Sequence, residues 1–471
     1  MQKKFLSNLV FVILLNLIVK PISIFGIDAT VQNQVGAESY GMYFSLLNLS
    51  FLFTIFLDLG INNYTTRHIA QFPHIVTRYM GKLLTFRLFL FLIYAVLTLF
   101  VAVWLGFELE QIGILALLLF NQLLVVFIGY FRSHFSGLLL FKTDALISIL
   151  DRLFLIIVGG YILFFSDHQI KIEWFVWMQT FAYGCTFLIA MFSLFKKIGL
   201  PKISFQWAFS LAIVKKSLPF AILFLLMTIY TRSDAILLER LHHEGEYQAG
   251  IYAQGFRLLD ALYMFGILFA NLLLPMFSAQ IKRREQILPL LKMSAEILIG
   301  GSFILMLVLI FNTHEILALI YSNNVDNTIV PFQYLMISFL GMTFTLIFGT
   351  LMTANGSLKL LNQISFIGCL VSLGLNFYLI PKFGANGAAL TSVITQVGLG
   401  ITQLIFVFFL FKFSFKIALI IKYVMFALVA TVLIKFLGFN IFIQLAFGIG
   451  LLFVFKMIDV KQILLTLKSN T

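Results

Sequence analysis

Long apolar stretches recur along the whole chain, and each has about the length that crosses a lipid bilayer. A membrane-spanning helix needs roughly 20 mostly apolar residues, because each residue adds about 1.5 Å of rise. The sequence predicts fourteen such spans, separated by short polar segments. They are expected at about 5–27, 38–62, 83–106, 112–131, 143–166, 173–195, 217–239, 248–276, 291–312, 331–353, 360–380, 386–410, 417–435 and 439–456. The fold class is therefore all-α and polytopic.

Composition supports a membrane protein without a soluble domain. Of the 471 residues, 61% are hydrophobic and 11% are charged, whereas a soluble protein carries about 25% charged residues. The first apolar run follows a basic head but has no small-residue cleavage site, so it predicts a span rather than a signal peptide. The longest outside loop, at about 313–330, is expected to hold a short interfacial helix.

The distribution of lysine and arginine predicts the orientation of the chain. With a cytoplasmic N-terminus, 23 of these residues fall in inside segments and 4 in outside loops. Cytoplasmic loops collect positive charge, so both termini are expected in the cytoplasm. The same bias accounts for most of the net charge of +13, and no nucleic-acid partner is needed to explain it.

The two halves of the sequence resemble each other. Residues 36–71 align on 245–280 without gaps, and nine of the 36 positions are identical, including the pairs Gly41/Gly250 and Tyr43/Tyr252. A second match at a similar offset relates 142–179 to 359–396. Both halves would enter the membrane from the same side, so we expect two parallel-related six-helix lobes. The predicted domains are 1–200, 201–412 and an appendix of two spans at 413–471.

Four cations lie inside predicted spans, at depths where charge is expensive. Arg152, Arg232 and Arg257 fall near the middle of their spans, and Lys20 lies beside Pro21, which should kink its helix. A charge at the bilayer centre costs roughly 2.5–3.5 kcal/mol on insertion scales, so such residues normally face a cavity or a partner. We expect these four cations to share one layer of the membrane, where arginine forks suit phosphate oxygens.

Structural roles are open alternatives for the same cations. Arg257 and Asp260 are three residues apart on one helical face and could neutralise each other, and Arg152 could pair with Asp144 or with a carboxylate on a neighbouring span. Arg87 and Arg132 are expected within about one turn of the cytoplasmic edge, where they can snorkel to water.

Four carboxylates in the spans are candidates for coupling transport to a proton or sodium gradient: Asp234, Asp260, Asp58 and Glu296. Asp234 is the favoured one, and polar packing is the alternative for the others. Gly159, Gly160, Gly300 and Gly301 are expected to permit close helix packing. Cys185 and Cys369 fall inside spans as small apolar residues, and no spacing of histidine, cysteine and carboxylate predicts a metal site.

Three segments, in the same order along the chain, resemble one transporter family. They are GAESYGMYFSLLNLSFLFTIFLDLGINNYTTRHIAQ at 36–71, SDAILLERLHHEGEYQAGIYAQGFRLLDAL at 233–262 and LNFYLIPKFGANGAALTSVITQ at 375–396. These segments resemble polysaccharide repeat-unit flippases, the O-antigen and exopolysaccharide branch of the multidrug/oligosaccharidyl-lipid/polysaccharide (MOP) exporter superfamily. The resemblance covers nearly the whole chain.

The resemblance implies a V-shaped, MATE-like pair of lobes and a non-enzymatic transport function. The expected substrate is an undecaprenyl-pyrophosphate-linked oligosaccharide, moved from the inner to the outer leaflet of a bacterial cytoplasmic membrane by alternating access. Membrane lipids, a polysaccharide polymerase and chain-length machinery are the expected partners. No cofactor is expected beyond a coupling proton or sodium ion.

Two other transport functions remain open, and an enzymatic function is disfavoured. A cation-coupled multidrug exporter would need an excess of carboxylates in its cavity, whereas mid-membrane cations here at least match the anions. A flippase for lipid-linked peptidoglycan precursors is chemically close to the first function. A membrane enzyme would need outside loops rich in acid and base residues, and these loops are short.

Overall fold

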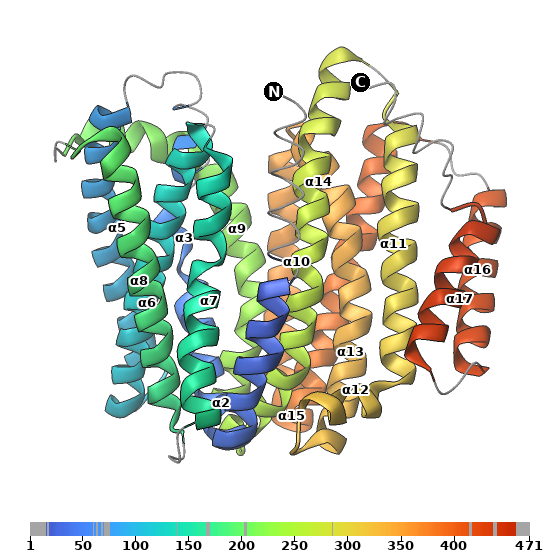
Figure 1. Cartoon of the computed structure of the whole chain (residues 1–471). Coiled ribbons are helices and arrows are strands. Elements are labelled where there is room, and N and C mark those ends of the chain that lie inside the picture. The colour runs from blue at the N-terminus through green and yellow to red at the C-terminus, as the bar shows by residue number, and fades with distance from the viewer. Residues whose placement is uncertain are drawn as a thin grey trace. The chain divides into compact units, whose positions relative to one another are not determined.

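A computed structural model of the chain describes most of its residues as helices. The described residues are 16, 18–59, 61–62, 65–66, 69, 76–138, 140–165, 170–201, 205–284, 286–413, 417–436 and 440–457. Within these ranges every regular element is a helix (Figure 1). The predicted all-α fold class is therefore confirmed. Residues 5–15 of the first predicted span and the tail at 458–471 lie outside the described ranges.

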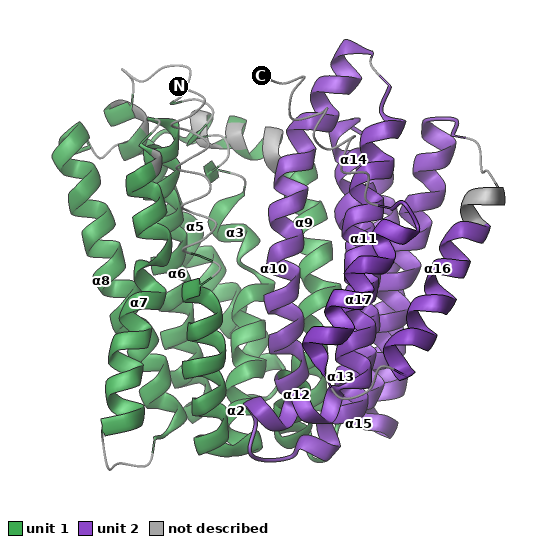
Figure 2. Cartoon of the chain, turned by 45° about the vertical axis from the view of Figure 1, so that its right-hand side comes forward, with its two compact units in different colours: residues 1–253 green, residues 254–471 purple. Residues whose placement is uncertain are grey.

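The chain forms two compact units, coloured separately in Figure 2. Unit 1 comprises residues 1–253 and unit 2 residues 254–471, so the boundary falls inside helix α10 (Gly245–Arg283). The lobes predicted at 1–200 and 201–412, and the appendix at 413–471, stay a prediction. Each unit is described by itself below.

Unit 1 is a bundle of long helices around an aromatic core. Helix α6 packs against α8 and α2, and α7 packs against α8. Phe86, Phe131 and Leu194 are buried in one apolar cluster contributed by α5, α6 and α8. The elements are η1 (Ile22–Asp28), α2 (Ala29–Leu52), α3 (Ile55–Asp58), α5 (Val76–Trp104), α6 (Leu109–Gly137), α7 (Phe141–Phe165), α8 (Ile172–Ile198), α9 (Trp207–Leu241) and the first residues of α10.

Unit 2 is organised around the long helix α15, against which α13 packs. Helix α11 contacts α13 on one side and the C-terminal helices α16 and α17 as well. The elements are the rest of α10, α11 (Leu288–Phe311), α12 (Thr313–Ile320), α13 (Val325–Phe344), η3 (Thr345–Gly349), α14 (Thr350–Ala354), α15 (Leu358–Leu410), α16 (Ile417–Phe436) and α17 (Ile441–Val454). Helix α12 confirms the short helix expected in the longest outside loop.

Nine helices within the described ranges are long and apolar enough to cross a membrane. The number is smaller than fourteen partly because α15 joins two predicted spans, and because α17 has only 14 residues. Apolar side chains such as Phe100, Trp104 and Phe165 are exposed on the outer faces of their helices. Exposed apolar surface on this scale is stable in lipid rather than in water. The protein is a multi-pass helical membrane protein.

The sequence explains where two helices are interrupted. The helix becomes a π-helix immediately after Pro21, whose missing N–H removes one hydrogen bond of the regular ladder. The predicted kink beside Lys20 therefore takes the form of irregular helix geometry. Within α15, Gly384 has φ +52° and separates the two predicted spans. Glycine adopts positive φ without the steric cost that a Cβ would add.

Close packing at glycine is confirmed at two of the four predicted positions. A Cβ on Gly159 would lie 2.9 Å from Ile27, and one on Gly300 would lie 2.9 Å from Leu452. The prediction is wrong for Gly160 and Gly301, where a Cβ would meet no other atom within 4 Å. Adjacent residues point about 100° apart on a helix, so only one glycine of each pair faces the neighbouring helix.

The duplicated glycines Gly41 and Gly250 lie at one crossing of helices α2 and α10. A Cβ on Gly41 would be 1.8 Å from the backbone oxygen of Glu246, and a Cβ on Gly250 would be 2.0 Å from that of Ala37. Each contact is the counterpart of the other under the same sequence offset, since 37 aligns with 246 and 41 with 250. This reciprocal contact supports the register of the internal duplication.

Candidate functional site

A group of cations surrounds Lys20 in unit 1. Lys20 is half-buried, and it interacts repulsively with Arg152 of α7 and Arg132 of α6 and attractively with Asp151. We call Lys20, Arg152 and Arg132 the cation cluster. The structure therefore brings together two of the four cations predicted from the sequence, Lys20 and Arg152.

The ion pairs around the cation cluster differ from the expected pairing of Arg152 with Asp144. Arg152 Nε lies 3.5 Å from Asp151 Oδ2, because a long arginine side chain can fold back toward the preceding residue. Asp144 instead accepts a 2.7 Å hydrogen bond from Arg132 Nε and one from Ser136. The short connection between α6 and α7 places these two helix ends together. Arg132 is therefore held by a carboxylate.

The other two predicted cations lie on α9 and α10. Arg232 on α9 is half-buried, its guanidinium lies 5.3 Å from the centre of the Phe51 ring, and Nη1 is 3.5 Å from Asn48 Oδ1. Arg257 and Asp260 are both half-buried on α10 in unit 2, and their pairing stays a prediction. The expectation that all four cations share one layer stays a prediction.

Asp58 and Arg87 form an ion pair inside the helix bundle of unit 1. Arg87 Nη2 lies 2.5 Å from Asp58 Oδ1, and the arginine side chain is 1% exposed. Asn62 Oδ1 accepts a second hydrogen bond of 2.7 Å, and the Tyr130 ring lies 4.6 Å from the guanidinium carbon. The expectation that Arg87 snorkels to water is wrong, because Asp58 on the neighbouring α3 gives it a charge partner inside the bundle.

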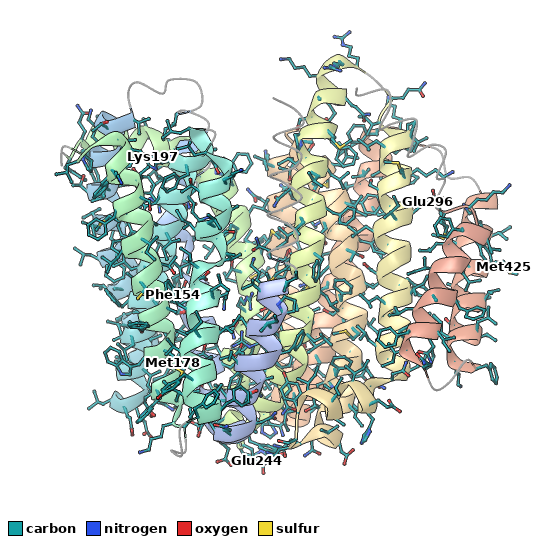
Figure 3. All side chains as sticks on the ribbon, in the orientation of Figure 1. Phe154, Met178, Lys197, Glu244, Glu296 and Met425 are labelled. Carbon is teal, nitrogen blue, oxygen red and sulfur yellow. The ribbon has the colours of Figure 1, made fainter. Side chains whose placement is uncertain are left out.

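Glu296 is also held by cations. It lies on α11 (Figure 3) and is 7% exposed. Lys422 Nζ of α16 is 3.2 Å away, Lys292 Nζ is 4.0 Å away, and the Tyr423 hydroxyl donates a 3.0 Å hydrogen bond. These contacts attach α16 to α11. These contacts favour polar packing for Asp58 and Glu296, and a coupling role for either stays a prediction.

Asp234 differs from these two carboxylates. It is 2% exposed on α9, and the Tyr252 hydroxyl donates a 2.8 Å hydrogen bond to Oδ2. Tyr252 is one of the duplicated tyrosines. Its counterpart, Tyr43, accepts a hydrogen bond of 2.8 Å from Gln179 instead. The two copies of the repeat therefore hold the same residue type in different polar environments.

An acidic cavity opens at one end of unit 1. It has a volume of about 650 Å³. Glu244 in its wall lies at the opposite end of the unit from Lys197, as Figure 3 shows. The lining residues are Glu38, Gly106, Glu108, Gln111, Glu239, Arg240, His242, His243, Glu244, Gly245, Glu246 and Tyr247. Five of these are glutamates.

This cavity was not predicted from the sequence. The pattern that could have indicated it is the run His242–His243–Glu244. One donor atom from each of these residues lies within 4.8 Å of the other two. Partial burial, and then the neighbouring His243 ring, lower the pKa of His242, so this imidazole is neutral over more of the physiological pH range. The glutamates come from separate helices and loops, so only the fold brings them together.

Comparisons with known proteins place the chain in a family and a fold. The model of the family described as "Polysaccharide biosynthesis protein" matches residues 5–280. A search of curated protein sequences finds no match to this chain.

Solved structures share the fold at low sequence identity. The structure of lipid II flippase MurJ in an inward closed conformation matches with a TM-score of 0.72 and 16% identity, covering 97% of this chain and 100% of that one. An inward-facing multidrug resistance MATE transporter of the MOP superfamily matches with a TM-score of 0.63 and 15% identity, covering 82% and 93%.

A third match is a MOP superfamily transporter from Pyrococcus furiosus Vc1, with a TM-score of 0.59 and 15% identity, covering 85% of this chain and 94% of that one. The family match confirms the resemblance to polysaccharide biosynthesis proteins, and the solved structures show that the chain shares the fold of these transporters. The family model matches more than half of the residues of this chain, so the chain belongs to the polysaccharide biosynthesis protein family.

Proposed function

We propose that the protein is a flippase that moves undecaprenyl-pyrophosphate-linked oligosaccharide repeat units from the inner to the outer leaflet of a bacterial cytoplasmic membrane, by alternating access. It functions as a transporter rather than an enzyme, with both termini in the cytoplasm. The observation that supports this function most directly is the cation cluster between helices of unit 1. The protein also belongs to a polysaccharide biosynthesis family.

The cation cluster has the chemistry that a pyrophosphate head group requires. Like charges that lie close together in a low-dielectric environment repel strongly, and a bound anion removes the repulsion. A phosphate cannot leave water without compensating charge and hydrogen bonds. Arg152 supplies a planar donor fork and Lys20 a compact charge, so the two can bind different phosphate oxygens. Arg232 on α9 and Arg257 on α10 stay predicted phosphate ligands.

Asp234 is the carboxylate that we propose for coupling to a proton or sodium gradient. Asp58 and Glu296 are held by cations and are suited to structural roles. Asp234 is 2% exposed on α9 and accepts a hydrogen bond from the Tyr252 hydroxyl. Asp234→Asn should block or uncouple gradient-driven flipping, with the protein still folded.

The experiment that tests the function uses purified protein in proteoliposomes. A lipid-linked repeat unit is supplied in one leaflet, and its arrival in the other is measured by accessibility to a soluble lectin. Arg152→Ala should reduce the flipping rate by at least about tenfold, since a charged hydrogen bond is worth roughly 1.5–3 kcal/mol. Arg152→Lys should recover part of the rate, because it restores charge but not the fork.

Lys171→Ala is the matched control, because Lys171 is exposed in the same unit. It should flip at the wild-type rate. Wild-type protein that moves no lipid-linked repeat unit would contradict the proposed function. Equal rates in wild type and Arg152→Ala would remove Arg152 from the binding surface but leave the function standing.

A second candidate is a flippase for lipid-linked peptidoglycan precursors. The likeness to the lipid II flippase extends over 97% of this chain, whereas the two MATE and MOP transporters cover 82% and 85%. The same proteoliposomes loaded with lipid II distinguish the two substrates. Faster movement of lipid II than of repeat units would favour this second function.

Multidrug export is the third candidate, and cellular assays separate it from the other two. If the protein exports drugs, deletion of its gene should raise drug susceptibility. If it is a repeat-unit flippase, the deletion should instead accumulate lipid-linked glycan in the cell. Co-purification would then show whether a polysaccharide polymerase or chain-length protein binds the flippase.

A further inference from the structure

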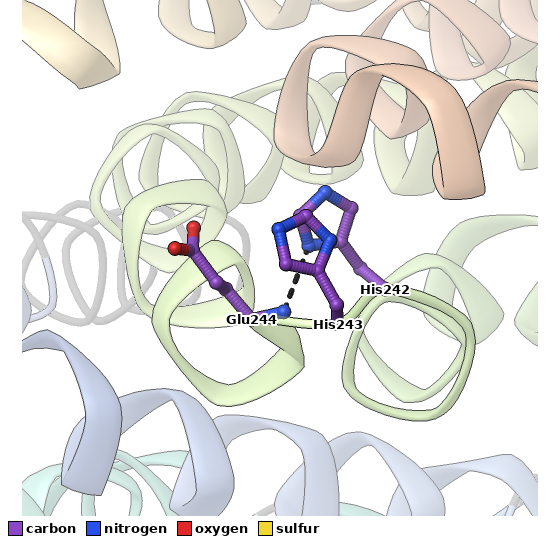
Figure 4. Close-up of side chains that lie close together, drawn as sticks. All are labelled: His242, His243 and Glu244. Atoms are coloured by element: carbon purple, nitrogen blue, oxygen red, sulfur yellow. Dashed lines mark hydrogen bonds between the residues drawn. The ribbon is translucent and has the colours of Figure 1, made fainter.

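The turn between α9 and α10 carries three consecutive metal-ligand residues at the acidic cavity. His242 is half-buried, and His243 and Glu244 are exposed. The two imidazole rings lie side by side, with centroids 4.2 Å apart, as Figure 4 shows. From this arrangement we propose that His242, His243 and Glu244 form a binding site for a divalent transition-metal ion of the zinc class. The site does not depend on which lipid the protein transports.

The donor set selects the class of ion. Imidazole nitrogen and carboxylate oxygen together are typical ligands of Zn²⁺, whereas Ca²⁺ and Mg²⁺ require oxygen donors. Three protein donors leave one tetrahedral position for water or for another carboxylate. Glu246 lines the same cavity and can approach from the first turn of α10.

The electrostatics of the cavity favour a cation of double charge. Glu38 and Glu108 both repel the carboxylate of Glu246, and Arg240 is the cation that opposes them. These residues come from α2, the α5–α6 connection and α9, and the fold holds them in one cavity with the histidines. A bound divalent cation would reduce the repulsion between the carboxylates, which adds to its affinity.

Binding requires a small local rearrangement. Donors in a tetrahedral zinc site with bonds of about 2.0 Å are about 3.3 Å apart, whereas here the donor atoms lie within 4.8 Å of one another. The Glu244 backbone N–H also donates a 3.1 Å hydrogen bond to His242 Nδ1 (Figure 4). If that nitrogen binds the ion, this hydrogen bond is lost. Two of the three side chains are exposed, so they can rotate without disturbing the core.

Zinc binding to purified protein tests the proposal. The affinity tag is removed, because polyhistidine binds metals, and Zn²⁺ is titrated in competition with a chromogenic chelator. The wild type should bind one ion per chain. The double variant H242A/H243A should bind it at least tenfold more weakly, since even outer-shell changes cost about 10–100-fold in affinity. H314A is the matched control, because His314 is also exposed and lies near a carboxylate, Asp326.

X-ray absorption of the zinc-loaded wild type provides a second measurement that needs no variant. The spectrum should show two imidazole ligands at about 2.0–2.1 Å. Zinc bound equally well by wild type and H242A/H243A would overturn the proposal. A loss as large in H314A, or a spectrum with sulfur ligands from Cys185 or Cys369, would overturn it as well.

Discussion

Two groups of charged side chains in unit 1 are held in opposite ways. Arg87 is 1% exposed and lies between a carboxylate, an amide and an aromatic ring. Lys20 is half-buried, and the groups acting on it include two other cations and one carboxylate. The first arrangement neutralises charge within the protein. The second places three cations near two carboxylates, Asp144 and Asp151, and a ligand can neutralise the remaining positive charge.

The difference teaches that depth in the membrane does not by itself identify a binding residue. Arg87 and Arg152 both lie within helices that are long enough to cross the bilayer. Both have a carboxylate partner, but the Arg87 side chain is 1% exposed, whereas that of Arg152 is 35% exposed and has other cations near it. Variants that remove one charge at a time should therefore affect stability in the first group and transport in the second.

Asp58→Asn should have the largest effect on stability. It leaves the buried Arg87 without its carboxylate, and an uncompensated buried charge costs about 3 kcal/mol. The side chain of Asp58 itself is 30% exposed, so removing Arg87 should cost less than removing Asp58. The free energy of unfolding in detergent measures both. The double variant Asp58→Asn/Arg87→Met should recover most of the loss.

The alternative role of Asp58 predicts a different result. If Asp58 coupled transport to an ion gradient, Asp58→Asn would fold as stably as the wild type and lose gradient-driven flipping. That outcome would erase the distinction between the two groups of charges.

Lys422→Met should have the next largest effect, in unit 2. It removes the closest cation from Glu296, but Lys292 and the Tyr423 hydroxyl remain within reach. We expect a loss of about 2 kcal/mol, below that for an isolated buried charge. Lys435→Met at the other end of α16 is the control, because Lys435 is exposed. Equal losses in both variants would show that α16 tolerates no substitution and that the ion pair is not the cause.

Arg132→Met should cost about 1 kcal/mol or less. Its side chain is 36% exposed and that of Asp144 is 19% exposed, and ion pairs near the surface contribute little. Thermal unfolding of the variant in detergent measures the loss. A destabilisation as large as that of Asp58→Asn would place Arg132 with the buried pair rather than with the cation cluster.

Lys20→Met should have the smallest effect on stability, and it should stabilise the protein, whereas the other variants destabilise it. Removing one of several repelling cations should leave stability unchanged or raise it by about 0.5 kcal/mol. The flipping rate should nevertheless fall, because a phosphate ligand is lost. A clear loss of stability in this variant would mean that Lys20 holds helices together.

The sequence is enough to predict the fold class and the register of the duplication, because apolar spans and repeated glycines are local patterns. It is not enough to predict the partner of Arg87, since Asp58 lies 29 positions earlier and only the packing of α3 against α5 brings them together. The pairing of Arg152 with Asp151 was missed because helical geometry separates adjacent residues, whereas a long side chain can bend back.

The acidic cavity shows the same limit. Its glutamates come from three parts of unit 1 that are far apart in sequence, at 38, at 108 and at 239–246, so no spacing rule could group all of them. His242, His243 and Glu244 are adjacent in sequence, but the usual ligand spacings for zinc do not include three consecutive donors. A pattern of donors becomes a candidate site only when the turn that carries them is known.

The reciprocal contact between Gly41 and Gly250 has a consequence for the origin of the chain. Because the two positions are copies of one ancestral position, a half-length ancestor that paired with itself would have had this glycine next to the two-fold axis of its homodimer. Gene fusion would then have converted a contact between identical chains into a contact within one chain. After the fusion, each copy of the repeat could diverge in sequence except at the positions where the two copies contact each other.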